Sequence, residues 1–239
     1  MHGRAIYYGR PVDPELRAAA IFDRLTGGWE RPLPEARPPV AINMISTVDG
    51  KVTVAGRVGN LTSPVDQRLL KRLRASADAV LVGAETVRVE RYSTLAVSPA
   101  PPLVVVSASL DFPPDHPSLH DTASPLIFLT PSDRTVEGAT RTIQYVREPS
   151  GQLGRMLERL RAEHGIERVV CEGGPHFNAW LFAEGLVDEM FLSISPTVVG
   201  GLSSLTAVAG SVAFDPVPMQ LAGYAEDEGY VYLRYLVGR

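Results

Sequence analysis

Short, uniformly apolar runs that alternate with helical patterns constrain the fold of this chain more than any other feature. The runs AVLVG (79–83), PLVVVS (102–107) and PLIFLT (125–130) are apolar at nearly every position rather than at every second one. A strand of this kind must be buried on both faces, as happens in a mainly parallel sheet that helices cover on each side. The sequence therefore predicts an α/β fold.

The remaining elements follow from the same patterns. Further strands are expected at 40–47, 142–146, 168–172 and 190–195, and helices at 63–75, at 151–164 and from Pro175 to near Gly185. The first of these helices has a clear start, with Ser63 as its cap, Pro64 first and Asp66 three residues after the cap. The closing segment MQLAGYAEDEGYVYLRYLVG predicts a hairpin turned through residues 226–229. We therefore expect a mixed, mostly parallel central sheet with helices on both faces and a C-terminal β-hairpin.

The first 39 residues differ from the remainder of the chain. Asp13 and Pro14 predict the start of a short helix that continues through Leu25, and a proline-rich link follows at residues 32–39. We expect an N-terminal arm over residues 1–39 and one larger domain over residues 40–239.

Composition excludes several classes of protein. The single cysteine, Cys171, excludes an internal disulfide framework and a cysteine-rich zinc site, and the five histidines show no metal-binding pattern, so no metal is expected. A net charge of −4 argues against a general nucleic-acid-binding protein. No apolar run approaches the roughly 20 residues that cross a bilayer, and the N-terminus lacks the apolar core of a secretory signal. We expect a cytoplasmic protein with neither nucleic acid nor membrane as a partner.

Two glycine-containing segments join expected strands to helices. Gly83 ends one strand and Thr86 opens a possible helix; Gly173 and Gly174 end another strand, and Pro175 follows as a first helical residue. A helix N-terminus offers unpaired N–H groups, and glycine lets a phosphate come close to the backbone. Two such ends suit a dinucleotide, although an ordinary turn explains each one alone. Neither segment matches the G-x-G-x-x-G fingerprint or the P-loop.

Charged residues near these segments have competing explanations. Glu172 ends an apolar strand, so its carboxylate needs a partner, which nearby backbone N–H groups are able to provide. The expected helix at 63–75 carries four basic residues: Arg68, Lys71, Arg72 and Arg74. Lys71 and Arg74 share a face that is able to meet a phosphate, whereas a solvated helix face is the simpler reading for most of these charges. Asp66 is equally explained as a capping-box acid, and Asp49 as a turn residue.

Three blocks carry a family resemblance. INMISTVDGKV, LTSPVDQRLLKRLRASADAVLVGAETV and VCEGGPHFNAWLFAEGLVDEMFLSISPTVVGG resemble the riboflavin-pathway pyrimidine reductases, in particular the reductase half of the bifunctional deaminase-reductase. The resemblance covers residues 40 to about 236 and implies a dihydrofolate reductase-like fold. The deaminase half carries H-x-E and P-C-x-x-C zinc motifs, which one cysteine does not satisfy. The resemblance therefore implies a stand-alone reductase.

The resemblance implies NADPH bound across the strand ends. The residues that match its cofactor contacts are Val82, Gly83, Thr86, Glu90, Gly173, Gly174 and Pro175, with Ser107 as a further candidate for the adenosine 2′-phosphate. An aspartate is more usual in the family at the position of Glu90. The resemblance also implies a cis peptide between Gly173 and Gly174.

On the substrate side the resemblance assigns Arg74 to the substrate phosphate and Glu172 to the substrate ring. Asp66, on the helix that faces the substrate in this fold, is a second acid for a pyrimidine or pteridine ring, so Asp66 and Glu172 are the catalytic candidates. The family's usual Ser and Trp are Val58 and Asn60 here, and Asn60 is kept as a substrate-binding candidate. A further phosphate-binding arginine has no clear counterpart in ERYSTLAVSPA.

The combined expectation is an NADPH-dependent reductase of a pyrimidine or a pterin, acting on a small molecule and assembled as a homodimer. A ribosylaminopyrimidine phosphate, in a reaction like that of 5-amino-6-(5-phosphoribosylamino)uracil reductase, is the first choice of substrate. Dihydrofolate or a related pterin is the second. A nucleotide-binding protein without catalytic activity is the alternative from another class.

Overall fold

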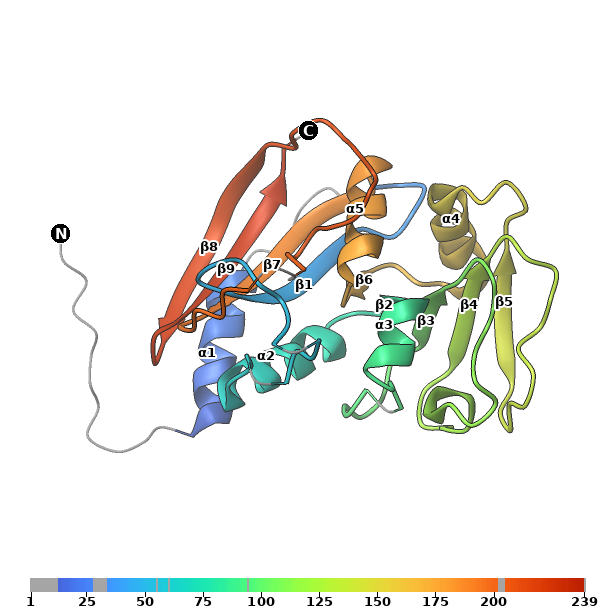
Figure 1. Cartoon of the computed structure of the whole chain (residues 1–239), viewed down its shortest axis with the longest axis horizontal. Coiled ribbons are helices and arrows are strands. Elements are labelled where there is room, and N and C mark those ends of the chain that lie inside the picture. The colour runs from blue at the N-terminus through green and yellow to red at the C-terminus, as the bar shows by residue number, and fades with distance from the viewer. Residues whose placement is uncertain are drawn as a thin grey trace.

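A computed structural model describes the chain at residues 13–27, 34–54, 56–59, 61–93, 95–201 and 205–238 (Figure 1). Asn60, one of the expected substrate contacts, lies outside these described residues.

A nine-stranded sheet runs through the described part of the chain. Its strands are β1 (Val40–Thr47), β2 (Ala79–Gly83), β3 (Leu103–Val106), β4 (Leu126–Thr130), β5 (Ile143–Arg147), β6 (Val169–Cys171), β7 (Val187–Ser195), β8 (Met219–Asp227) and β9 (Tyr230–Val237). Their order in the sheet is β5-β4-β3-β2-β6-β1-β7-β9-β8. The strands from β5 to β7 pair in parallel, and β9 is antiparallel to both β7 and β8. The mixed, mostly parallel sheet with a C-terminal hairpin is therefore confirmed.

Helices cover both faces of the sheet, as Figure 1 shows. On one face lie α1 (Pro14–Thr26), α2 (Pro64–Ala75) and α3 (Ala84–Val89), and on the other lie α4 (Leu153–His164) and α5 (Pro175–Ala183); a short 3-10 helix spans Pro117–Leu119. Successive residues of β1 alternate between these layers, with Val40 and Ile42 packed toward α4 and α5 and Ala41 toward α1 and α2. This alternation is why the strands are apolar at almost every position.

The helix expected in the N-terminal segment is present as α1. The side chain of Asp13 accepts a hydrogen bond from the Glu15 N–H at 2.8 Å, which caps the first turn. Ala18, Ile21 and Leu25 are buried in the same apolar cluster as the inner face of α2. This helix therefore covers part of the sheet.

Local backbone features explain where the helices α2 and α3 begin and how the C-terminal hairpin turns. The hydroxyl of Ser63 accepts from the Asp66 N–H at 3.0 Å, so α2 begins at Pro64 as expected. The helix α3 begins at Ala84 rather than at Thr86, because Gly83 is already its N-cap with an extended backbone. Glu228 and Gly229 both have positive φ, which gives the two-residue turn that suits the twist of a β-hairpin.

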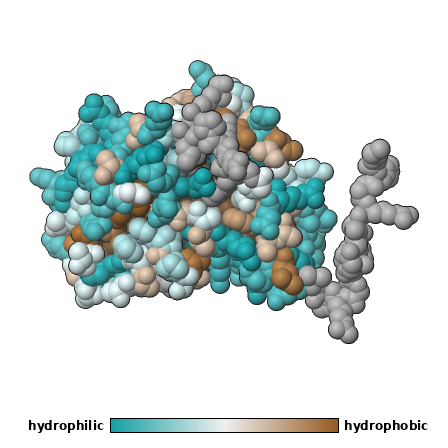
Figure 2. All heavy atoms as spheres, turned by 180° about the vertical axis from the view of Figure 1, so that it is seen from behind, coloured by the Kyte–Doolittle hydropathy of each residue, from teal (hydrophilic) through white to brown (hydrophobic). Residues whose placement is uncertain are grey.

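The described helices are all too short or too polar to cross a membrane. Figure 2 shows a largely hydrophilic rear face on which hydrophobic residues form several separate patches. Among the described residues no group of three or more histidine, cysteine or acidic side chains is arranged to hold a metal ion.

Candidate active site

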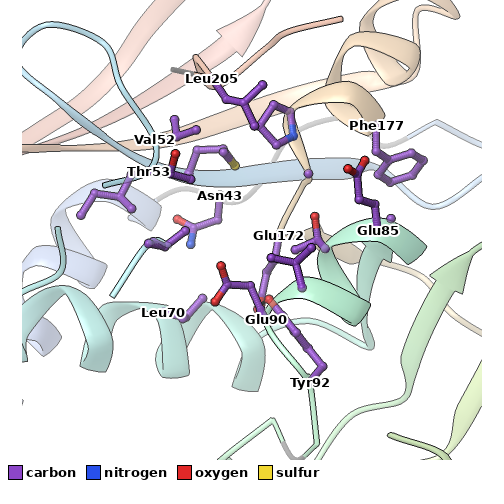
Figure 3. A pocket seen from close by; sticks show the side chains of 18 of the residues that line it. Asn43, Val52, Thr53, Leu70, Glu85, Glu90, Tyr92, Glu172, Phe177 and Leu205 are labelled. Atoms are coloured by element: carbon purple, nitrogen blue, oxygen red, sulfur yellow. Dashed lines mark hydrogen bonds between the residues drawn. The ribbon is translucent and has the colours of Figure 1, made fainter. Parts of the chain in front are cut away.

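A cleft of about 490 Å³ opens near the carboxyl ends of the central strands. It exists because β6 stops at Cys171, which is opposite Ile42, whereas β1 continues to Thr47. On the side away from β7, residues 43–45 of β1 therefore border an opening rather than a neighbouring strand, and they line the cleft. The other walls come from α2, α3, the start of α5 and loop residues, which are Val52, Thr53, Gly56, Val58, Thr62 and Leu205 (Figure 3). A cleft of this size is typical of a small-molecule site.

The two predicted glycine segments form one structure at the edge of the cleft. The Gly83 N–H donates to the Gly173 carbonyl at 2.8 Å, which joins the ends of β2 and β6. Gly173 and Gly174 have φ values of +79° and +38°, a conformation that favours glycine. A Cβ on Gly174 would lie 2.5 Å from Oγ1 of Thr86, and one on Gly173 would lie 2.8 Å from the sulfur of Met44. A side chain at Gly174 would therefore require Thr86 to move, and one at Gly173 would require Met44 to move.

The cis peptide expected between Gly173 and Gly174 is not found. The cis bond among the described residues is that between Ser98 and Pro99. The chain makes its turn here through positive φ at two consecutive glycines, so it reverses direction with a trans peptide between them.

The helices α3 and α5 both begin at this glycine structure. Their N-caps are Gly83 and Gly174, which have no side-chain oxygen to bond the first-turn N–H groups. Pro175 is the first residue of α5, as expected, and Phe177 packs against Gly83, where an added Cβ would lie 3.0 Å from that of Phe177. The two helix ends thus bring partial positive charge to one edge of the cleft.

Glu172 finds its partner in a side chain rather than in backbone N–H groups. Arg74 donates from Nε to Oε1 of Glu172 at 2.6 Å and from Nη2 to Oε2 at 2.7 Å. The Tyr92 hydroxyl donates to the same Oε2 at 2.7 Å, and Nη1 of Arg74 donates to the Leu95 carbonyl at 2.5 Å. The Arg74 and Glu172 side chains are only 11% and 5% exposed. The two expected substrate contacts are therefore bonded to each other.

This pairing changes the ionisation of its members. Burial acts to lower the pKa of Arg74, but the hydrogen bonds and negative charge of Glu172 outweigh it, so the pKa is raised. Burial, reinforced by the charge of Glu172, raises the pKa of Tyr92 well above its usual value. The arginine is thus held charged and the tyrosine neutral.

Two other basic residues of α2 have a structural role, as the simpler reading predicts. Arg72 pairs with Glu15 of α1 at 2.5 Å, and Arg68 lies 3.5 Å from the same carboxylate. These contacts tie α2 to α1 on the exposed side of the helix layer. They do not belong to the cleft lining.

Asp66 is a buried acid in the wall of the cleft. It is 9% exposed, and among the described residues no basic side chain bonds to it. Burial raises its pKa to about 6, and a hydrogen bond with Ser193 of β7 offsets part of that rise. An unpaired buried carboxylate of this kind is costly to the fold, and such groups concentrate at functional sites.

The expected cofactor residues are not all in the cleft. Those that line it are Gly83, Thr86, Glu90, Gly174 and Pro175. Gly173 forms the turn directly behind them, and the side chain of Val82 packs into the core beneath α3. Ser107 is buried at the end of β3, where its hydroxyl accepts from the Leu110 N–H at 3.1 Å, and it does not line the cleft.

Several cleft residues were not predicted from the sequence. They include Asn43, Met44, Val52, Thr53, Leu70, Glu85, Arg91, Tyr92, Phe177 and Leu205, most of which Figure 3 labels. Asn43 gave a usable signal, because it is a polar residue within an otherwise apolar strand. Tyr92 and Arg91 gave none, since they follow α3 in a segment without a repeating pattern.

Asp49 does more than occupy a turn. Its carboxylate accepts from the Thr47 hydroxyl at 2.5 Å and from the N–H groups of Gly200 and Val199 at 2.8 and 3.3 Å. The bond from Thr47, followed by that from Gly200, lowers the pKa of Asp49 to about 2. Asp49 thus ties the turn after β1 to the loop after β7. In the chain this turn lies between Ile45 and Val52, which both line the cleft.

These features define an α/β enzyme whose ligand cleft lies at the carboxyl ends of its parallel strands. The sequence profile of the RibD C-terminal domain matches residues 38–228. The chain therefore belongs to the RibD C-terminal domain family, which confirms the resemblance to the riboflavin-pathway reductases.

Individual relatives agree with this assignment. The chain is 35% identical over 184 residues to the 2,5-diamino-6-ribosylamino-4(3H)-pyrimidinone 5′-phosphate reductase of Methanothermobacter thermautotrophicus, covering 73% of this chain and 85% of the relative. It is 27% identical over 177 residues to the riboflavin biosynthesis protein RibD of Aquifex aeolicus, covering 71% of this chain but 49% of that protein.

Solved structures share the fold. A pyrimidine reductase-like protein of Corynebacterium diphtheriae superposes with a TM-score of 0.72 at 23% identity, covering 92% of this chain and 99% of that one. The yeast riboflavin biosynthesis reductase Rib7 gives a TM-score of 0.67 at 17% identity, covering 93% and 99%. The α/β fold is thus that of the pyrimidine reductases.

Proposed function

We propose that this chain uses NADPH to reduce a ribosylaminopyrimidine 5′-phosphate. One observation carries the proposal: a cleft in which a side-chain-free glycine turn at two helix N-termini is combined with the buried acid Asp66. The first feature suits a diphosphate and the second suits the polar edge of a heterocycle. The relative from Methanothermobacter thermautotrophicus, by its name, reduces a substrate of this class.

The residues at the glycine turn fit a nicotinamide nucleotide. A Cβ on Gly174 would lie 2.5 Å from Oγ1 of Thr86, and the glycine lets a diphosphate come close to the backbone at the start of α5. Gly83, Thr86, Gly174 and Pro175 would hold the diphosphate, and Glu90 would accept hydrogen bonds from a ribose hydroxyl. When bound, the nicotinamide ring supplies a hydride to the substrate.

We propose that Val82 and Ser107 contribute to binding the adenosine end of NADPH. Val82 supports the strand end from within the core, and Ser107 ends the neighbouring strand β3. Because the Ser107 hydroxyl accepts from Leu110, its own proton is still available for donation to a 2′-phosphate.

At the substrate end of the cleft the chain supplies hydrogen-bonding side chains and an apolar lining. The ionised carboxylate of Asp66 accepts hydrogen bonds from ring N–H and amino groups. Glu172, held by Arg74 and Tyr92, has about one of its four acceptor positions left for the same ring. Apolar residues such as Met44, Val52, Leu70 and Leu205 line the cleft and exclude water from the reacting carbon. The protein thus acts mainly by holding the two reactants in line.

A pterin such as dihydrofolate is the second candidate substrate. Asp66 favours it, because a buried acid is equally able to accept from the amino and N–H groups along one edge of a pteridine ring.

We further propose that the enzyme is a cytoplasmic homodimer. The strand β8 forms an edge of the sheet, spans nine residues, and exposes Leu221 and Tyr224. A long open edge with exposed apolar side chains favours pairing with a second copy. Size-exclusion chromatography with light scattering measures the molar mass of the protein in solution. A monomer at micromolar concentration would contradict this part of the proposal.

The activity test follows the nicotinamide absorbance after NADPH is mixed with the protein and either the ribosylaminopyrimidine 5′-phosphate or dihydrofolate. We expect oxidation with the pyrimidine, slower or no oxidation with dihydrofolate, and a strong loss of rate in Asp66→Asn. If neither substrate oxidises NADPH above the rate without protein, the proposed function is wrong.

A further inference from the structure

The charge of the cleft poses a problem for a phosphorylated substrate. Four carboxylates line it, those of Asp66, Glu85, Glu90 and Glu172, whereas Arg74 and Arg91 are the lining arginines. A phosphate monoester carries up to two negative charges, so it needs a cation that no carboxylate already neutralises. This reasoning rests on the proposed function, in which the substrate bears such a group.

Arg74 does not provide that cation. All three of its nitrogens donate hydrogen bonds, Nε and Nη2 to Glu172 and Nη1 to the Leu95 carbonyl. A phosphate that used Arg74 fully would have to displace a buried carboxylate, leaving Glu172 charged and without its partner. The arginine that the resemblance assigns to the phosphate is thus already in use.

Arg91 is free by contrast. Its side chain is exposed at the cleft, and no acidic side chain in the described part of the chain forms an ion pair with it. The other basic group in the lining, His176, lies 3.4 Å from Glu85. Arg91 is therefore the cleft arginine whose charge remains available to a ligand.

The backbone around Arg91 is held in place. The Tyr92 N–H donates to the Val87 carbonyl at 3.1 Å, the Tyr92 hydroxyl donates to Glu172, and the Leu95 carbonyl accepts from Arg74. Arg91 itself has φ of +49°, an uncommon value for a residue with a side chain, which is tolerated where the surrounding structure fixes it. A fixed backbone with a free guanidinium suits a phosphate-binding position.

The position of Arg91 favours the substrate over the cofactor. It follows the six-residue helix α3, so about 9 Å of helix separates it from the glycine turn at Gly83. Tyr92, the next residue, bonds to Glu172 at the substrate end, and Figure 3 shows Tyr92 on the same side of the cleft as Leu70 of α2. We propose that Arg91 binds the phosphate monoester of the substrate and is a specificity-determining residue for the phosphorylated form.

The test compares Arg91→Met with wild type, using the ribosylaminopyrimidine 5′-phosphate and its dephosphorylated form. We expect KM for the phosphorylated substrate to rise at least about tenfold, as for a lost hydrogen bond to a charged group. KM for the dephosphorylated substrate and the Kd for NADPH should not change. Arg91→Lys should restore part of the loss. Arg88→Met is the matched control, because Arg88 lies on α3, donates to the Asp111 carbonyl and does not line the cleft.

Calorimetry with ribose 5-phosphate separates this inference from the proposed function. Wild type should bind it more tightly than Arg91→Met does, whether or not the pyrimidine is turned over. Equal affinity of the two proteins, or no binding to wild type, overturns the role of Arg91. A weaker Kd for NADPH with unchanged KM for the phosphorylated substrate also overturns it, because the phosphate would then be the cofactor's.

Discussion

Removing the carboxylate of Glu172 is the most direct test of how the substrate end of the cleft is built. In Glu172→Gln the guanidinium of Arg74 stays buried without its counter-charge. Removing one partner of a buried ion pair costs about 3–5 kcal/mol. We expect about 3 kcal/mol, the lower end, because glutamine keeps one oxygen for the bonds at 2.6 and 2.7 Å that the carboxylate now accepts.

The double variant Arg74→Met with Glu172→Gln identifies the cause. Once the arginine is also replaced, no unpaired charge remains, so the double variant should be more stable than Glu172→Gln alone. The coupling between two residues in direct contact lies within about 0.5–3 kcal/mol. We expect the upper half of that range, since the side chains are 11% and 5% exposed. Both variants contain Glu172→Gln, so its effect on the hydrogen bond of Tyr92 is common to them.

Urea unfolding followed by circular dichroism measures these free energies, and Glu189→Gln is the matched control. Arg234 donates to Glu189 at 2.8 Å in a pair that is 5% and 11% exposed and lies outside the cleft. Both single variants should lose stability, whereas only Glu172→Gln should raise KM for the pyrimidine. A loss below about 1 kcal/mol for Glu172→Gln, or strictly additive effects in the double variant, would refute the reasoning.

Three further predictions concern single positions. The pKa of Asp66 is raised from 3.8 to about 6, so the native state favours its protonated form; this stability is present below pH 3.8 and is lost as the pH rises through 6. Asp66→Asn should therefore be up to about 3 kcal/mol more stable than wild type above pH 7 and no more stable below pH 4, by urea unfolding at each pH. Gly174→Ala places a Cβ 2.5 Å from Oγ1 of Thr86 and should weaken NADPH binding at least about tenfold in calorimetry, as for a lost charged hydrogen bond. The control Gly185→Ala, also at positive φ but with nothing within 4 Å of its Cβ, should bind NADPH normally, and equal affinities would contradict the role of the glycine turn. Ser63→Ala removes the cap of α2 and should cost about 1 kcal/mol in urea unfolding; an unchanged midpoint would show that the cap does not stabilise the helix.

The elements could be predicted because their signals are local. The apolar run at residues 79–83 and the Ser63 cap with Pro64 after it are sufficient to define a buried strand and a helix start. The helix α3 begins at Ala84, two residues before the start at Thr86 that the sequence predicts, because Gly83 already has the extended backbone of an N-cap. A glycine cap leaves no side-chain signal.

The partners within the site could not be predicted in the same way. Arg74 and Glu172 are 98 residues apart in the chain, and their contact depends on how α2 packs against the end of β6. Tyr92 joins them from an irregular segment, where no periodicity indicates which way a side chain points. The sequence predicts a turn at Gly173, but it does not specify whether the chain turns there through a cis peptide or through positive φ at two glycines.

The brevity of β6 has a chemical consequence for ligand selection. Because that strand ends opposite Ile42, the peptide groups of residues 43–45 that point to its side have no strand to bond. A flat heterocycle that slides into the gap meets main-chain donors and acceptors much as an added strand would. Because main-chain groups stay in place when side chains mutate, their contribution to recognition of the ring edge, in addition to that of Asp66, should survive substitutions at the phosphate end.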